Sequence, residues 1–170
     1  MEHLADDLFV YAAQLGARPQ IRHSLPFEAT ARHPGGAVNT VRANPDAGVA
    51  GLLDVLSACG AMLAAMVRVT PSAVTAFHSF GPADAEASAA MGVLETMVHT
   101  YDVATGLGVE WSPDRPLCAR VLARLMPDVD AATGPDGDPW RVLLWATGRI
   151  DLPDRPRRRQ WRWHNTRPGR

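Results

Sequence analysis

Residues 84–108 read DAEASAAMGVLETMVHTYDVATGLG. Apolar side chains recur in this stretch at the three- and four-residue spacing of one helix face, at Met91, Leu94, Val98 and Tyr101. Asp84 is a favourable residue before the first turn of a helix, and the sequence Gly106-Leu107-Gly108 is favourable at its end. The stretch therefore predicts one long helix with an apolar face.

Four further segments combine the same apolar spacing with start or stop signals. They are residues 2–16, closed by Gly16; 46–70, which begins at Asp46 and stops before Pro71; 112–127, with the start Ser112-Pro113-Asp114; and 138–148, with the start Asp138-Pro139. Proline directly after a capping residue is a common helix start. The segment 46–70 is so apolar that we expect it to be largely buried.

Extended structure is predicted at two places only. Residues 27–30 and 38–41 flank Pro34-Gly35-Gly36, which favours a loose hairpin. Residues 157–164 alternate in a way that fits one C-terminal strand with Trp161 and Trp163 on the same side. Long helices with so little strand predict a mainly α fold, a helical bundle over residues 1–154 with 155–170 as the Arg-rich strand or tail of the same domain.

The charge is distributed unevenly along the chain of 170 residues. All 17 basic residues are arginine, which excludes chemistry that needs a lysine base, Schiff base or phosphate-loop lysine. Seven of these arginines lie in residues 155–170, so residues 1–154 hold ten against 18 acidic residues. An acidic body argues against nucleic acid as the partner, because a nucleic-acid interface needs a basic face.

The sequence also predicts a compartment. The longest uncharged apolar run, Val55–Val67, is shorter than the roughly 20 residues that cross a bilayer, so we expect no membrane partner. Cys59 and Cys118 lie in apolar helical segments, where they fit small core residues, and no signal pattern precedes them. A cytoplasmic protein is the simplest expectation.

The predicted helix over 84–108 carries three groups that chemistry could use. Glu95, His99 and Asp102 fall within about 60° of one another at 100° per residue, so they share one face at the edge of the apolar surface. A carboxylate and an imidazole one turn apart can bind the same divalent ion. The same spacing also fits an ordinary Glu–His pair on a half-exposed face.

A metal site would need a third ligand. The candidate histidines are His3, His23, His33, His78 and His164, and spacing does not choose among them. Periodicity places His3 well away from the apolar face of its helix, one turn before Asp7, as expected for a solvated histidine. His78 lies between Phe77 and Phe80 in a loop that we expect to border a pocket.

Taken together, these motifs resemble the metal-binding domain of the mycothiol-dependent maleylpyruvate isomerase family, within the DinB-like superfamily. The resemblance spans nearly the whole chain. It rests on four features of the sequence. They are His3-Leu4 in the first helix, the predicted hairpin around Pro34-Gly35-Gly36, which contains no tryptophan, the stretch Phe80-Gly81-Pro82-Ala83-Asp84, and the run from Glu95 through His99 to Asp102.

The resemblance implies a four-helix bundle in which His3, Glu95 and His99 bind a divalent ion. Zinc is the expected metal and nickel the alternative. Asp102 would contact one of the ligands without binding the metal itself. Family members carry another helix before the one that holds the first histidine, and residues 1–170 show none. We expect a bundle without this helix, completed by an upstream extension, by another chain, or by the predicted helices 112–127 and 138–148. A homodimer is a separate expectation for the partner.

Two imidazoles and one carboxylate leave a zinc coordination position open, as in catalytic sites. The resemblance implies that a low-molecular-weight thiol such as mycothiol uses this position, and that the reaction is isomerisation or S-transfer on a small electrophile. The alternative is a non-catalytic ligand-binding or interaction module on the same bundle with a degenerate metal site.

Overall fold

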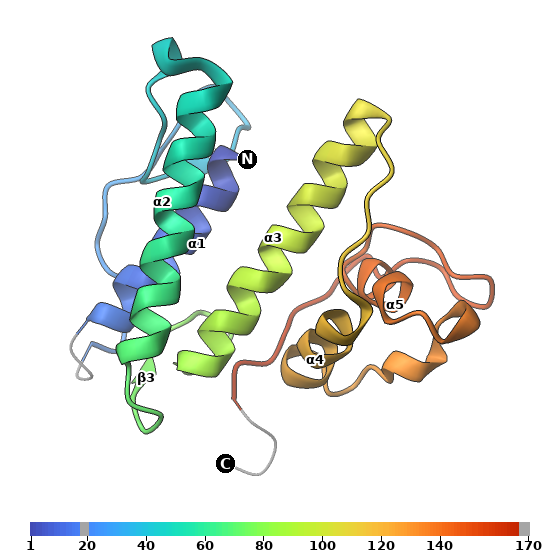
Figure 1. The fold of residues 1–170 in the computed structure, drawn as a ribbon. Coiled ribbons are helices and arrows are strands. Elements are labelled where there is room, and N and C mark those ends of the chain that lie inside the picture. The colour runs from blue at the N-terminus through green and yellow to red at the C-terminus, as the bar shows by residue number, and fades with distance from the viewer. Residues whose placement is uncertain (18–20, 167–170) are drawn as a thin grey trace.

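Helices dominate the computed structural model, which describes residues 1–17 and 21–166 (Figure 1). Its α-helices are α1 (Glu2–Gly16), α2 (Gly48–Val69), α3 (Ala85–Leu107), α4 (Arg115–Leu125) and α5 (Pro139–Ala146). The antiparallel strand pairs are β1 (Thr30–Ala31) with β2 (Val38–Asn39), and β3 (Thr75–Ala76) with β4 (Ala83–Asp84). Short 3-10 turns cover Pro45–Ala47, Ala131–Thr133 and Pro135–Gly137. The prediction of a mainly α chain with a small hairpin is confirmed.

Helix α3 lies at the centre of the arrangement (Figure 1). It contacts α1 and α2 on one side and α4 on the other, and α4 in turn contacts α5. Gly92 allows the close approach of the first three helices, because a Cβ at this position would lie 2.5 Å from Leu63 of α2 and 3.1 Å from Leu8 of α1. The two halves of the chain therefore share one core, with α3 as the common element.

Aspartates cap the helices of the second half. Asp84 accepts a hydrogen bond from the backbone N–H of Ala87, and Asp138 accepts one from Trp140, as the sequence predicts. The start of α4 differs from the prediction, because Asp114, and not Ser112, accepts from the N–H of Leu117. Pro116 stands in the first turn of this helix and takes the place predicted for Pro113.

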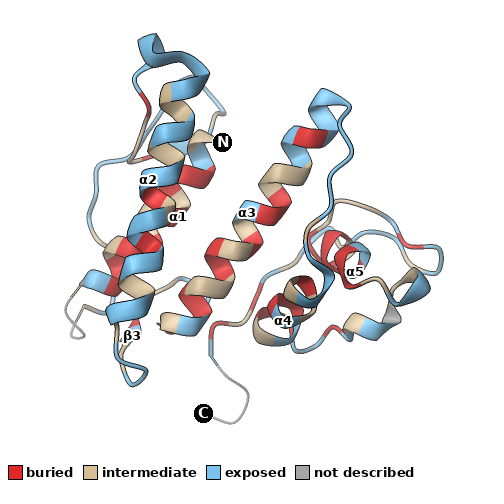
Figure 2. Ribbon diagram, viewed as in Figure 1, coloured by how far each residue is buried: buried red, intermediate tan, exposed pale blue. Residues whose placement is uncertain are grey.

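The prediction that the second helix is largely buried is wrong. Within α2 only Cys59 and Leu63 are buried, whereas Val49 and Val69 are 74% and 70% exposed. Figure 2 shows the exposed surface running along this helix, in contrast to the buried positions of α3. The periodic pattern identifies the helix correctly, but α1 and α3 cover only one of its faces. By length and composition alone, Pro45–Val69 would suffice to cross a membrane.

The predicted C-terminal strand is also absent from the described part of the tail, residues 155–166, which is irregular apart from one isolated bridge between Leu152 and Arg155. No strand lies alongside it there to complete a ladder. Instead His164 donates its backbone N–H to Leu125 at the end of α4, and the Asn165 amide donates to Gly81 before α3. Trp163 is buried against His78 and Phe80. The tail thus ties α4 to the start of α3.

Several tail arginines form ion pairs with acidic residues of the body. Arg158 pairs with Asp128 at 3.0 Å, and Arg157 with Asp151 at 3.2 Å. The guanidinium of Arg155 lies over the Trp145 ring. These contacts direct positive charge of the tail toward the acidic body.

Candidate metal centre

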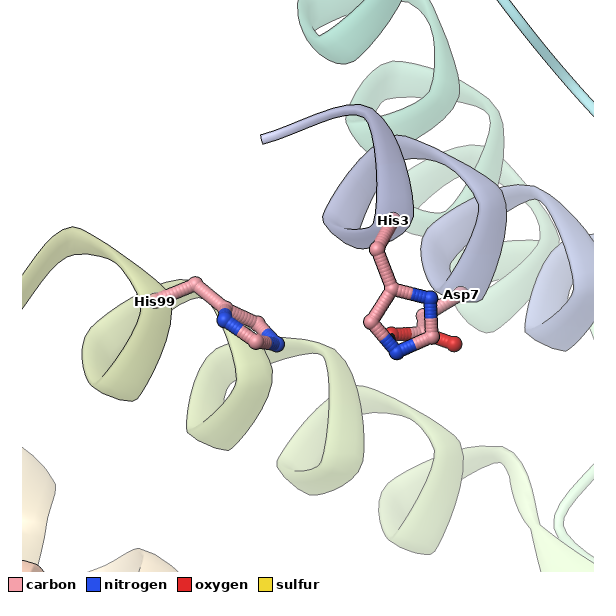
Figure 3. A group of neighbouring side chains, drawn as sticks. All are labelled: His3, Asp7 and His99. Atoms are coloured by element: carbon pink, nitrogen blue, oxygen red, sulfur yellow. Dashed lines mark ion pairs between the residues drawn. The ribbon is translucent and has the colours of Figure 1, made fainter. Parts of the chain in front are cut away.

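Three potential metal ligands meet where α1 crosses α3. His3 and Asp7 lie one turn apart on α1, and His99 faces them from α3 (Figure 3). One ligand atom from each of the three residues lies within 4.8 Å of the others. The rings of His3 and His99 are nearly perpendicular, with centroids 5.7 Å apart. The helix crossing therefore joins two imidazoles and one carboxylate in a single group.

Glu95 stands directly beside this group, although it is not one of the three. Its Oε2 lies 3.2 Å from Nε2 of His99, and its side chain is only 12% exposed. The sequence prediction that Glu95 and His99 share a face agrees with this geometry. Asp7 is the residue that sequence reasoning missed as a ligand, although its one-turn spacing from His3 was a usable signal.

The opposite edge of His99 is supported by Asp102. Oδ2 of Asp102 lies 3.4 Å from Nδ1 of His99. Arg149, which follows α5, holds the same carboxylate with two hydrogen bonds of 2.9 and 2.8 Å. A carboxylate behind an imidazole fixes the orientation and tautomer of the ring, leaving the other nitrogen for a metal.

The first turn of α1 is held in place by the hairpin segment that follows it. The Asp6 carboxylate accepts hydrogen bonds from the backbone N–H groups of Thr40 and Val41, at 2.8 and 2.7 Å. Arg32 binds both carboxylate oxygens of Glu2. Nδ1 of His3 itself lies 3.4 Å from the side-chain oxygen of buried Asn39 in β2. His3 is therefore fixed by tertiary contacts, although half of its side chain is exposed.

The centre carries excess negative charge. Burial and the neighbouring Glu95 carboxylate raise the pKa of Asp7 to about 7, and His3 and His99 oppose this effect only in part. Burial, together with Glu95 and Asp7, also raises the pKa of Tyr11. A buried carboxylate with a second carboxylate beside it forms a site that a divalent cation would stabilise.

A cavity of about 220 Å³ begins at Asp7 and extends away from the two imidazoles. Tyr11, Ser88 and His78 are among the polar residues that line it, so His78 does border a pocket. The backbone N–H of Phe80 donates to Nδ1 of His78 at 3.0 Å, and burial lowers the pKa of this histidine. The neutral ring therefore carries its proton on Nε2, where it can donate a hydrogen bond.

The remaining candidate histidines lie elsewhere. His23 and His33 each place a ring nitrogen near the carbonyl of the following residue, Ser24 and Pro34. His164 belongs to the tail segment held by Leu125. Of the five candidates for a third ligand, only His3 approaches His99 in the ligand group.

Searches of family models, curated proteins and solved structures find no match to this chain.

Proposed function

We propose that this protein binds one divalent metal ion, zinc in the first place and nickel as the alternative, in a DinB-like bundle. His3, Asp7 and His99 would hold the ion, with Glu95 beside it. The observation that carries the proposal is the meeting of these three donors within 4.8 Å of one another. Two imidazoles and a carboxylate are a donor set that zinc uses in catalytic sites.

Two features beyond the donors support a metal. Asp102 lies behind His99 and is itself held by Arg149, which is the usual support of a ligating histidine. The raised pKa of Asp7 reflects burial and an unbalanced carboxylate pair that a cation would neutralise. A buried carboxylate beside a second one is costly without a positive charge nearby, and a divalent ion would supply that charge.

We further propose that the metal centre serves a thiol-dependent isomerase or S-transferase acting on a small electrophile. Bound zinc would lower the pKa of a coordinated thiol and so supply a thiolate near neutral pH. The resemblance implies a small external thiol such as mycothiol. The chain's own thiols are unsuited to this role, because burial raises the pKa of Cys59 and raises that of Cys118 to about 11.

The cavity beside Asp7 is suited to the electrophile. Its volume of about 220 Å³ lies below the roughly 300–1,000 Å³ of pockets for drug-sized ligands, which favours a substrate of few atoms. His78 offers a donor from its Nε2 and Tyr11 offers a phenol that burial keeps protonated. These two groups would orient a carbonyl or carboxylate of the substrate while Asp7 stays with the metal.

Metal content tests the first part of the proposal. We expect purified protein to hold about one equivalent of zinc or nickel by elemental analysis, and His99→Ala to lose it. His33→Ala is the matched control, since His33 lies in the exposed hairpin turn. Metal-free wild type whose stability does not change on adding zinc would favour the alternative, a non-catalytic binding module.

Thiol binding tests the second part. Cobalt-loaded protein titrated with a small thiol should develop a thiolate-to-cobalt absorption band, and Cys59→Ala with Cys118→Ala should keep it. A band that is lost in the double variant would assign the sulfur to the protein itself. Cobalt binding without any new band would leave a metal-binding module and reject the thiol chemistry.

A further inference from the structure

One face of α2 is apolar, exposed and uncovered by the described part of the chain. Leu53, Met62 and Val69 are 51%, 42% and 70% exposed along this helix. The adjoining groove between α2 and α3, of about 580 Å³, is also mostly apolar. Exposed apolar surface of this extent usually marks an interaction site.

Two charged residues interrupt this face. Asp54 and Arg68 are both exposed, and neither has an ion-pair partner among residues 1–17 and 21–166. They lie 14 residues apart, which is about four turns or 21 Å along the axis, so they project from the same side of the helix. Ala61 lies midway between them on that side.

We propose that α2 pairs antiparallel with α2 of a second copy of this chain, with Ala61 on the twofold axis. In this register Asp54 meets Arg68 of the second copy, and Arg68 meets its Asp54, so that symmetry forms the ion pair twice. The charge arrangement is self-complementary only when the helices run antiparallel, because a parallel pair would place like charges opposite each other. A twofold contact of this kind is the commonest interface between identical chains.

The residues between the two charges fit the same geometry. Ser57, Ala58, Ala61 and Ala65 are small and exposed, so two helix backbones can come close. The larger apolar residues, Leu53, Met62 and Val69, flank this line and would be covered by the second copy. The surface thus has small side chains at the axis, larger apolar side chains along its edges and opposite charges at its two ends.

A lipid surface fits the same face less well. Asp54 lies in the middle of the exposed side, and an unpaired carboxylate in hydrocarbon costs several kcal/mol by general estimates. A second copy neutralises this charge with Arg68, whereas lipid tails do not. We therefore assign the face to self-association.

Charge exchange tests the pairing and its direction. Sedimentation equilibrium of the full chain should show a dimer, and Asp54→Arg and Arg68→Asp should each weaken it by about tenfold. The double variant Asp54→Arg, Arg68→Asp should recover most of the loss, because it restores both ion pairs in reversed sense. Both charges are exposed, so circular dichroism should show the same helix content throughout. A wild-type chain that stays monomeric would overturn the proposal, and so would a double variant whose dimer is as weak as those of the single variants.

Cysteine cross-linking tests the position of the axis. Ala61→Cys should oxidise readily to a disulfide-linked dimer, since the two copies of residue 61 meet. Ala65→Cys is the matched control, because its two copies would lie about 12 Å apart along the axis and should not cross-link. Equal cross-linking at both positions would indicate a parallel pair. A monomer that co-sediments with neutral lipid vesicles through this face would assign the surface to a membrane instead.

Discussion

Arg149 holds Asp102 with two hydrogen bonds, and Asp102 in turn lies 3.4 Å from the ring of His99. Arg149 follows α5 and Asp102 belongs to α3, so the contact joins the second half of the chain to the candidate metal centre. The imidazole that would bind the metal is therefore positioned by a residue 50 positions away in the sequence. This relationship gives the segment that follows α5 a role in the proposed function, although it contributes no ligand.

Replacing Arg149 should weaken metal binding without removing a donor. We expect Arg149→Met to lower zinc affinity roughly tenfold, because Asp102 would no longer be held behind His99. Competition with a chelating dye measures the change. Arg158→Met is the control, since Arg158 pairs with Asp128 on the tail side and should leave affinity unchanged. Equal affinity in all three proteins would contradict the positioning role.

The two carboxylates at the centre should differ in importance. We expect Asp7→Asn to lower zinc affinity roughly 100-fold, because Asp7 belongs to the group of donors that meet, and Glu95→Gln to lower it less. Calorimetric titration of both variants gives the comparison. A larger loss in Glu95→Gln would transfer the carboxylate ligand to Glu95, as the family resemblance implies.

The acidity of Asp7 predicts a pH dependence of the metal-free protein. The pKa of Asp7 rises from its ordinary value of 3.8 to about 7 on folding, so the folded chain binds the proton more tightly than the unfolded chain. Between about pH 4 and about pH 7 this group therefore makes the free energy of unfolding fall as pH rises, and outside that window its contribution no longer changes with pH. Urea unfolding of wild type and Asp7→Asn between pH 4 and 8 should show the wild type losing stability relative to the variant. A constant difference between the two would contradict the raised pKa.

Local periodicity located the half of the site that lies on one helix. Glu95, His99 and Asp102 share a face because three- and four-residue spacings put them there, whatever the rest of the fold does. Asp7 and Arg149 depend on how α1 crosses α3 and on where α5 ends, which no local pattern specifies. The spacing along its own helix predicts a solvated His3, whereas the contact with Asn39 of the docked hairpin shows that this side chain is held in place.

The same limit explains two of the differences between the predicted and the observed fold. The apolar spacing of α2 predicts a helix with strong burial, yet spacing describes the helix alone and not the number of neighbours that cover it. The alternation around Trp161 and Trp163 predicts a strand, but a strand also needs a partner for its backbone hydrogen bonds. In the structure those bonds go to the ends of other elements, such as Leu125 in α4.

Trp163 should be a main anchor of the tail. It is 6% exposed, and its ring lies 5.1 Å from that of Phe80 and 5.8 Å from that of His78 between centroids. We expect Trp163→Ala to lower the free energy of unfolding by about 3 kcal/mol, as for other large aromatic side chains removed from a core. Trp161→Ala should cost less, because Trp161 is only half-buried. Urea denaturation of both variants measures the difference, and equal losses would contradict the anchoring role.

Gly148 joins the tail, the end of α5 and Arg149 in one place. Its φ of +74° is a conformation that glycine adopts easily, and a Cβ there would lie 2.6 Å from the carbonyl oxygen of Arg158. Gly108, at the end of α3, has a similar φ of +67° but open space around it. Gly108→Ala should therefore cost only the conformational strain, about 1 kcal/mol, whereas Gly148→Ala should cost about 2–4 kcal/mol because backbone must also move.

The displacement caused by Gly148→Ala should also reach the metal centre. Arg149 is the next residue, so a shift of the backbone at Gly148 would disturb its two hydrogen bonds to Asp102 and lower zinc affinity. Gly108→Ala should leave that affinity unchanged, since a Cβ at Gly108 would meet nothing within 4 Å. Measuring zinc affinity and unfolding in both variants separates the two effects. A Gly148→Ala protein that is destabilised but binds zinc normally would show that Arg149 keeps its position independently of the turn before it.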